Sequence, residues 1–166
     1  MNWYALHVRS NMERLVSLQL CDAGIGQFYP HTVQRSRDDR RDIERKFMPG
    51  YVFARFDLAR KAPVVAIEQV VSILGWALKP AAIPDTEIEA IQKIVIYPSE
   101  AVQPCAFMAE GTRVRVMRGP LKDLEGYVVY SKNALRVVVS VQMLARSISA
   151  EVDADSLTLL DEKAAA

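Results

Sequence analysis

The sequence contains only two cysteines, Cys21 and Cys105, among its 166 residues. Two isolated cysteines do not make a disulfide framework, and the cysteine and histidine spacing does not match a zinc site. The sequence also lacks a P-loop, a nucleophile elbow and an HExxH motif. We therefore expect no metal, no cofactor and no catalytic residue. An enzyme would have to pair Cys21 with a histidine, but Cys21 lies in a helical pattern that predicts burial.

Long apolar runs and a strong excess of one charge are missing as well. No apolar stretch approaches the roughly 20 residues that a membrane span needs. The N-terminus runs straight into the apolar residues 3–6 without a basic segment, which argues against a signal peptide. The formal net charge is only +1, so any contact with nucleic acid has to come from a local patch. We expect a cytoplasmic monomer that does not contact a membrane.

Two kinds of hydrophobic periodicity divide the first 97 residues into short elements. A period of two predicts strands, and a spacing of three to four predicts amphipathic helices. The predicted strands cover residues 3–8, 26–34, 47–56 and 70–76, and the predicted helices cover residues 11–23, 61–68 and 86–95. Ser10 with Glu13, and Thr86 with Glu89, have the spacing of capping boxes at the starts of the first and third helices.

The most distinctive segment is FMPGYVFARF at residues 47–56. Pro49 and Gly50 interrupt a strand-like run of aromatic and β-branched residues, so we expect a kinked strand with aromatic side chains near the kink. Just before it, residues 35–46 hold six basic and four acidic side chains. Such a run cannot be buried, and it predicts an exposed hairpin tip or loop.

From residue 110 onward the pattern consists of strands alone. Five short strands separated by turn signals within ~55 residues predict a small barrel, in which Gly119 and Gly126 serve turn conformations. Residues 98–109 lack periodicity and contain prolines, which predicts a linker. The predicted fold class is therefore α+β. Residues 1–97 form an antiparallel four-stranded sheet with flanking helices, and residues 110–161 form a five-stranded β-barrel.

Three segments, in this order, resemble one known family. WYALHVRSNMER at residues 3–14, FMPGYVFARF at 47–56 and KPAAIPDTEIEAI at 79–91 resemble the N-terminal domain of the NusG family. EGTRVRVMRGPLKDLEGYVV at residues 110–129 is similar to the KOW motif that follows it in that family. The resemblance implies a transcription elongation and antitermination factor. Its N-terminal domain would bind RNA polymerase across the cleft and suppress pausing, and its KOW domain would tether a partner.

The resemblance also implies three sets of binding residues. The set expected to bind the clamp helices of the largest polymerase subunit is His7, Met48, Tyr51, Phe53 and Trp76. The set expected to contact the non-template DNA strand is Arg9, Arg14, Arg35 and Arg37, with Arg40 and Arg41 as further candidates. Leu121 and Leu124 lie in the loop where the KOW domain would bind a small-subunit ribosomal protein or Rho. Each set has a plainer alternative: core packing for the apolar residues and a solvated hairpin for the arginines.

Two further questions stay open at this point. The arginine-rich segment and the aromatic-proline strand end resemble specialised, operon-selective paralogues of the RfaH type or the polysaccharide-operon regulators, rather than the housekeeping factor. A ribosome- or RNA-binding protein that uses the KOW barrel is the alternative from another class, and it leaves the N-terminal segments without a role. In one relative the C-terminal domain refolds as a helical hairpin, but the β-branched residues in 128–141 predict a constitutive barrel here.

Overall fold

The chain, described here from a computed structural model, folds into two compact units. The structure describes residues 1–35, 41–77, 79–97, 102–105, 111–131, 134–141 and 144–160. The first unit consists of Met1–His31 and Lys46–Ile88, and the second of Thr32–Arg45 and Glu89–Ala166. The predicted limits of the two domains and of the linker stay predictions. Within the described residues, no helix has the length and apolar character needed to span a membrane.

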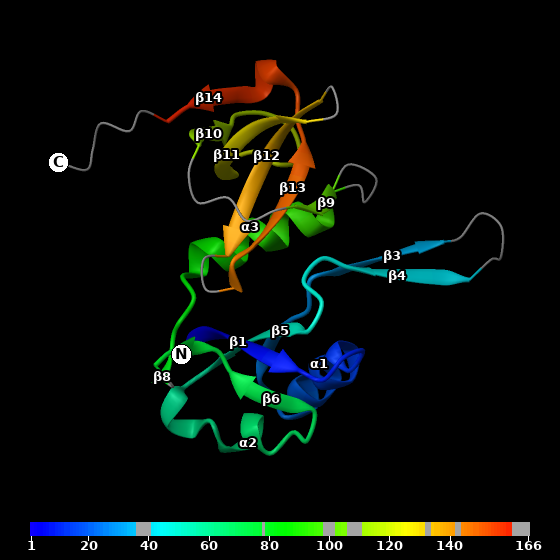
Figure 1. Cartoon of the computed structure of the whole chain (residues 1–166), viewed down its shortest axis with the longest axis vertical. Helices are drawn as coiled ribbons and strands as arrows, with labels where there is room; N and C mark the ends of the chain where they lie inside the picture. The colour runs from blue at the N-terminus through cyan, green and yellow to red at the C-terminus, as the bar shows by residue number, and fades with distance from the viewer. Residues whose placement is uncertain are drawn as a thin grey trace. The chain divides into compact units, whose positions relative to one another are not determined.

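A four-stranded antiparallel sheet forms the centre of the first unit (Figure 1). Its order is β2-β5-β1-β6, and its strands are β1 (Asn2–Val8), β2 (Gly26–Phe28), β5 (Tyr51–Phe56) and β6 (Val70–Ile73). Strand β1 pairs with β5 along its length, from Asn2 opposite Phe56 to His7 opposite Tyr51. The predicted four-stranded sheet is confirmed.

One face of this sheet packs against helices α1 (Glu13–Asp22) and α2 (Ala62–Val65). The buried side chains of this core are Tyr4, Leu6, Val8, Val16, Leu20, Tyr29, Val52, Ala54, Phe56 and Val64. Pro63 lies in the first turn of α2, as expected, and the short 3-10 helix η1 (Leu58–Arg60) precedes it. Because side chains alternate along a strand, the opposite face carries Trp3, Ala5 and His7 from β1, and Tyr51, Phe53 and Arg55 from β5.

The helix starts differ from the predicted capping boxes. Helix α1 begins at Glu13, and Met12 at the N-cap position makes no side-chain capping bond. The prediction for Ser10 and Glu13 is wrong because the Glu13 carboxylate bonds to another segment. Helix α3 (Asp85–Ile96) includes Thr86, so this residue is not the cap. Cys21 is exposed rather than buried, because Val16 and Leu20 form the buried side of α1.

The predicted strand over residues 26–34 is two strands. Strand β2 ends before Tyr29-Pro30, and β3 (His31–Arg35) pairs with β4 (Asp42–Lys46) in a separate two-stranded sheet. Proline has no N–H to donate to a ladder, which accounts for the break. Strands β3 and β4 fit the expected charged hairpin, and residues 36–40, including Arg37 and Arg40, lie outside the described residues.

The strand predicted over residues 47–56 is confirmed only from Tyr51 onward, and the predicted kink is a turn that precedes the strand. Pro49 and Gly50 form a turn in which Gly50 has a φ of 86°, and β5 starts only at Tyr51. A positive φ suits glycine because it has no Cβ to clash with the backbone. The predicted strand 70–76 ends earlier, at Ile73. Beyond it, β7 (Gly75–Trp76) and β8 (Lys79–Pro80) form a small two-stranded sheet.

The boundary between the two units falls within α3. Its apolar stripe is confirmed, because Ile88, Ile91 and Ile94 are all buried. The second unit is built on a six-stranded sheet in the order β14-β10-β11-β12-β13-β9. Its strands are β9 (Val102–Cys105), β10 (Thr112–Val116), β11 (Glu125–Ser131), β12 (Ala134–Val141), β13 (Arg146–Glu151) and β14 (Leu157–Leu159), with the 3-10 helix η3 (Ala154–Ser156) before β14.

All five strands predicted after residue 110 are present and neighbour one another in this sheet, where Figure 1 draws them from yellow-green (β10) to red (β14). Strand β9 is a sixth strand that the sequence did not predict. Gly119 has a φ of 84° and serves a turn, as expected. Gly126 does not, because it lies within β11. A Cβ there would lie 2.4 Å from the carbonyl oxygen of Val138 on β12, so close strand packing explains this glycine.

Candidate functional site

An aromatic pair stands on the sheet face opposite α1 and α2. His7 of β1 lies opposite Tyr51 of β5, and their ring centroids are 5.7 Å apart. His7 is exposed and Tyr51 is half-buried. The structure therefore brings together two of the five predicted polymerase-binding residues at a position that a partner can reach.

Two other members of that set are buried. Phe53 and Met48 both have 0% of their surface exposed. Phe53 shares the face of Tyr51, as expected, and its ring stacks on that of Phe28 at a centroid distance of 6.0 Å. Both side chains therefore fit the alternative of core packing. A direct binding role for Met48 and Phe53 stays a prediction.

Trp76 is the most open of the five, with 69% of its surface exposed. It lies in β7, outside the four-stranded sheet, where it pairs with Lys79 of β8. A large aromatic side chain with this exposure is unusual unless a partner covers it. Trp76 is thus available for binding.

The same sheet face holds functional candidates that the sequence reasoning missed. Trp3 lies under the Arg55 guanidinium, whose central carbon is 6.0 Å from the ring centroid. Arg55 also pairs with Asp85 at 3.3 Å. The register between β1 and β5 places Trp3 opposite Arg55, and period-two alternation from Tyr51 and Phe53 was the signal that could have found Arg55.

The turn before Tyr51 is held by a buried carboxylate. Glu13 is 2% exposed. Its Oε1 accepts a hydrogen bond from the backbone N–H of Gly50 at 2.9 Å, and its Oε2 accepts one from Lys46 Nζ at 2.8 Å. Lys46 Nζ donates a second bond to Asn11 Oδ1 at 3.0 Å. Asn11 has a φ of 62°, a conformation that asparagine tolerates better than most residues.

Electrostatics keep this carboxylate ionised. Burial by itself raises the pKa of Glu13, but the hydrogen bonds from Lys46 and Gly50 and the charge of Lys46 lower it. The lowering effects together outweigh burial, so the pKa of Glu13 lies below its usual value. The site therefore contains an ion pair between buried Glu13 and half-buried Lys46, and Glu13 links α1 to the Pro49–Gly50 turn.

The predicted nucleic-acid residues are exposed where the structure describes them. The side chain of Arg9 is 60% exposed and lies 3.5 Å from Glu68. Arg14 on α1, Arg35 at the end of β3 and Arg41 before β4 are also exposed. Arg37, the remaining member, lies outside the described residues. Exposure suits both nucleic-acid binding and a solvated surface, so this role stays a prediction.

In the second unit, the loop between β10 and β11 borders a hollow of about 460 Å³. Its lining residues are Tyr97, Val116, Arg118, Gly119, Pro120, Leu121, Val152, Asp153, Ala154, Asp155 and Ser156. Leu121 and Leu124 are 2% and 1% exposed. Both side chains therefore pack into the core, as the alternative held, and Leu121 is also one of the residues that line the hollow. Their role in partner binding stays a prediction.

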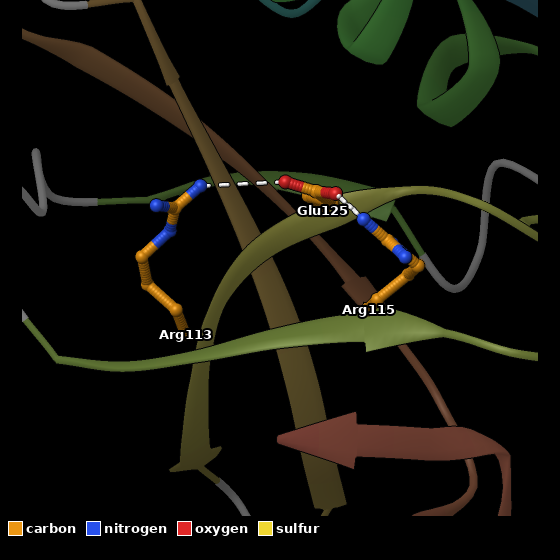
Figure 2. Close-up of polar contacts among 3 residues, drawn as sticks. All are labelled: Arg113, Arg115 and Glu125. Atoms are coloured by element: carbon orange, nitrogen blue, oxygen red, sulfur yellow. Dashed lines mark hydrogen bonds and ion pairs between the residues drawn. The ribbon is translucent and has the colours of Figure 1, made fainter. Parts of the chain in front are cut away.

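The outer side of the β10–β11 pair carries a cluster of three charges (Figure 2). Glu125 lies between two arginines, and one carboxylate oxygen pairs with Arg113 at 3.3 Å while the other pairs with Arg115. The arginine side chains are 51% and 45% exposed. One carboxylate thus compensates two guanidinium groups, which leaves this patch with one surplus positive charge.

Comparison with known proteins yields one family. Residues 1–92 match the family model described as "Transcription termination factor nusG". The chain is 28% identical over 169 residues to the transcription termination/antitermination protein NusG of Pseudomonas aeruginosa, an alignment that covers 91% of this chain and 94% of the relative. It is 33% identical over 120 residues to NusG of Escherichia coli strain K12, covering 69% and 65%.

A solved structure entitled "Domain interaction in Thermotoga maritima NusG" is similar in fold. Its TM-score is 0.52 at 18% sequence identity, with 96% of this chain and 97% of that chain covered. The structural likeness extends beyond the residues that match the family model, and at this identity it concerns the fold alone.

Proposed function

Because the chain belongs to the NusG family of transcription termination and antitermination factors, which are not enzymes, we propose that it acts by binding RNA polymerase during elongation. A factor that clamps a moving enzyme needs no catalytic group. It needs a higher affinity for the closed state of the enzyme than for the open state. A difference of about 1.4 kcal/mol shifts that equilibrium tenfold.

The observation that carries the proposal is the aromatic pair on the sheet face opposite α1 and α2. His7 and Tyr51 are accessible, their rings are 5.7 Å apart, and fully buried Phe53 supports the same face. Aromatic side chains in such a setting are common anchors of protein interfaces. The partner surface is proposed to be the clamp helices of the largest polymerase subunit, with the exposed ring of Trp76 as a further contact.

Co-purification with cognate core RNA polymerase tests this proposal. Tyr51→Ala should lower the affinity by about 2 kcal/mol, which is roughly 30-fold, if Tyr51 is an anchor. Tyr130→Ala is the matched control, because Tyr130 is 72% exposed on β11 in the other unit. Wild-type protein that brings down no polymerase, or equal binding by the two variants, would contradict the proposal.

We further propose that the factor is operon-selective and reads the non-template DNA strand. The support is the charged β3–β4 hairpin, whose exposed Arg35 and Arg41 flank its tip, together with exposed Arg9. Arginine pairs with phosphate and stacks on unpaired bases. Nascent-transcript profiling after depletion of the factor distinguishes the two roles: a uniform elongation defect on all genes would reject selectivity, and a defect confined to a few long operons would support it.

The second unit is proposed to tether a partner protein, such as a small-subunit ribosomal protein or Rho, through the hollow beside residues 118–121. Arg118 suits this role, because it borders the hollow while its guanidinium donates a hydrogen bond to the backbone oxygen of Asp155 at 2.6 Å. This bond joins two residues that line the hollow, so it holds the Arg118 side chain in place before a partner binds. Pull-down with Arg118→Ala should lose the partner while polymerase binding persists.

A ribosome- or RNA-binding role for the KOW-like unit is the alternative. Exposed Arg113 and Arg115 on β10 favour it, since arginine contacts supply most nucleic-acid affinity. Both arginines pair with Glu125, however, and this negative charge weakens the case for RNA binding. A pull-down that yields ribosomes but no polymerase would favour this alternative over the main proposal.

A further inference from the structure

Glu13 is the only buried carboxylate within the described residues. Burying an ionised side chain is costly unless every oxygen is paired. Glu13 meets this condition with two donors that lie 33 and 37 residues away in the sequence, the ammonium of Lys46 and the backbone N–H of Gly50. A helix that already buries Val16 and Leu20 does not need a charged side chain for stability.

The peptide groups of Gly50 are held from two sides. The N–H of Gly50 donates to Glu13, and its carbonyl oxygen accepts a bond from the N–H of Val8 at 2.9 Å. These two bonds hold Gly50 at its positive φ of 86°. The next residue is Tyr51, and the residue before Val8 is His7. Each bonded residue is therefore the sequence neighbour of one member of the aromatic pair: Gly50 precedes Tyr51, and Val8 follows His7.

We propose that Glu13, together with Lys46, is a positioning residue that presents Tyr51 and His7 to RNA polymerase. The inference rests on the proposed function, because the surface that it positions is the proposed polymerase-binding surface. Buried ion pairs are poor stabilisers compared with apolar contacts of equal volume, and geometric specificity is one reason to retain them. Here the ion pair would fix the direction in which the chain leaves the Pro49–Gly50 turn and enters β5.

The sharpest test is Glu13→Gln, which keeps the size of the side chain. A carboxylate offers one oxygen to Gly50 and another to Lys46, whereas an amide offers a single oxygen and a donor group. The variant must therefore lose one of the two bonds. If the competent turn conformation then falls to about a tenth of the population, the affinity for polymerase falls about tenfold.

Ser17→Ala is the matched control on the same helix. Ser17 Oγ donates to Gln27 Oε1 at 2.6 Å, so the control also removes one hydrogen bond between α1 and a strand. It leaves the turn untouched. Both variants should lower Tm, because each removes a hydrogen bond between α1 and another segment. Only Glu13→Gln should weaken polymerase binding, speed hydrogen exchange at the Gly50 amide and shift the NMR signals of Tyr51 and His7.

The outcomes separate this inference from the proposed function. Wild-type protein that fails to bind polymerase overturns both. Wild-type binding with Glu13→Gln no weaker than Ser17→Ala, or with unchanged Gly50 exchange, overturns the inference alone. If Glu13→Gln fails to fold, Glu13→Asp replaces it, because its shorter side chain keeps the charge but cannot reach both donors. The same affinity and exchange readouts then decide.

Discussion

Tyr51 and Phe53 stand two residues apart on the same face of β5, yet Phe53 is fully buried and Tyr51 is only half-buried. The β1 residues opposite them show the same gradient, because Ala5 is fully buried and His7 is exposed. The surface therefore changes from core to accessible within one step of the strand repeat. Substitutions at these two positions should separate folding from binding.

Phe53→Ala should destabilise the protein by about 3–5 kcal/mol, because it leaves a cavity where a fully buried ring packs on Phe28. Tyr51→Ala should cost far less, about 1 kcal/mol, since its ring is already partly in water. Urea unfolding followed by circular dichroism measures both values. Equal losses at the two positions would mean that Tyr51 belongs to the core and is not a binding residue.

The ion pair of Glu13 and Lys46 predicts a pH dependence of stability. The folded-state pKa of Glu13 lies below the usual value of 4.5, so the folded state binds this proton less readily than the unfolded state does. The stabilisation is therefore complete above the usual pKa and disappears as the pH falls through that value to the lower folded-state pKa.

Urea unfolding of wild-type protein and Glu13→Gln at a series of pH values measures this dependence. The difference in unfolding free energy should be constant from neutral pH down to about pH 5.5, and it should shrink below that, since only the wild type carries the titrating group. A difference that grows toward acid would show that the folded-state pKa is raised and that burial dominates over the hydrogen bonds.

The sequence predicted the strands better than it predicted their ends. Alternation identified β1, β5, β6 and β10 to β14, because each has one apolar face and periodicity reports this directly. Local signals failed where a distant residue competed for the same atoms. Ser10 and Glu13 have capping-box spacing, but the Glu13 carboxylate bonds to Lys46 and Gly50 instead. Nothing in a window of four residues reveals a partner more than 30 positions away.

The sequence also predicted only part of the candidate site. The family resemblance drew attention to His7, Tyr51 and Trp76, which are accessible, and to Met48 and Phe53, which are not. Aromatic residues near a Pro-Gly turn look alike in sequence, whether they face water or the core. Burial depends on which segment covers them, and that is a property of tertiary packing.

Gly126→Ala should selectively destabilise the second unit. A Cβ at this position would lie 2.4 Å from the Val138 carbonyl oxygen and 2.9 Å from Val137 Cγ1, so β11 and β12 would have to separate. We expect a loss of about 1–3 kcal/mol from this overpacking. Gly24→Ala is a contrasting control, because no atom lies within 4 Å of its Cβ and only its φ of 69° is strained. Hydrogen exchange should show weakened protection in β11 and β12 for Gly126→Ala alone.

The Arg113–Glu125–Arg115 cluster in Figure 2 allows a direct test of nucleic-acid binding by the second unit. Glu125→Gln removes the shared counter-charge and releases both arginines. If this face binds single-stranded RNA, each released arginine that reaches a phosphate should steepen the salt dependence of log K by about 0.7. Filter binding to a single-stranded RNA at several salt concentrations measures this slope.

Glu151→Gln is the control with the same change in net charge. Glu151 lies 3.5 Å from Arg136, whose side chain is only 8% exposed, so this substitution does not release a cation into solvent. An RNA slope that rises for Glu125→Gln and not for Glu151→Gln would mean that the face has latent nucleic-acid affinity, which Glu125 suppresses in the wild type. Equal slopes for the two variants would mean that Arg113 and Arg115 do not bind RNA. These two arginines would then contribute nothing to phosphate binding even without their counter-charge, and the RNA-binding alternative would lose its support.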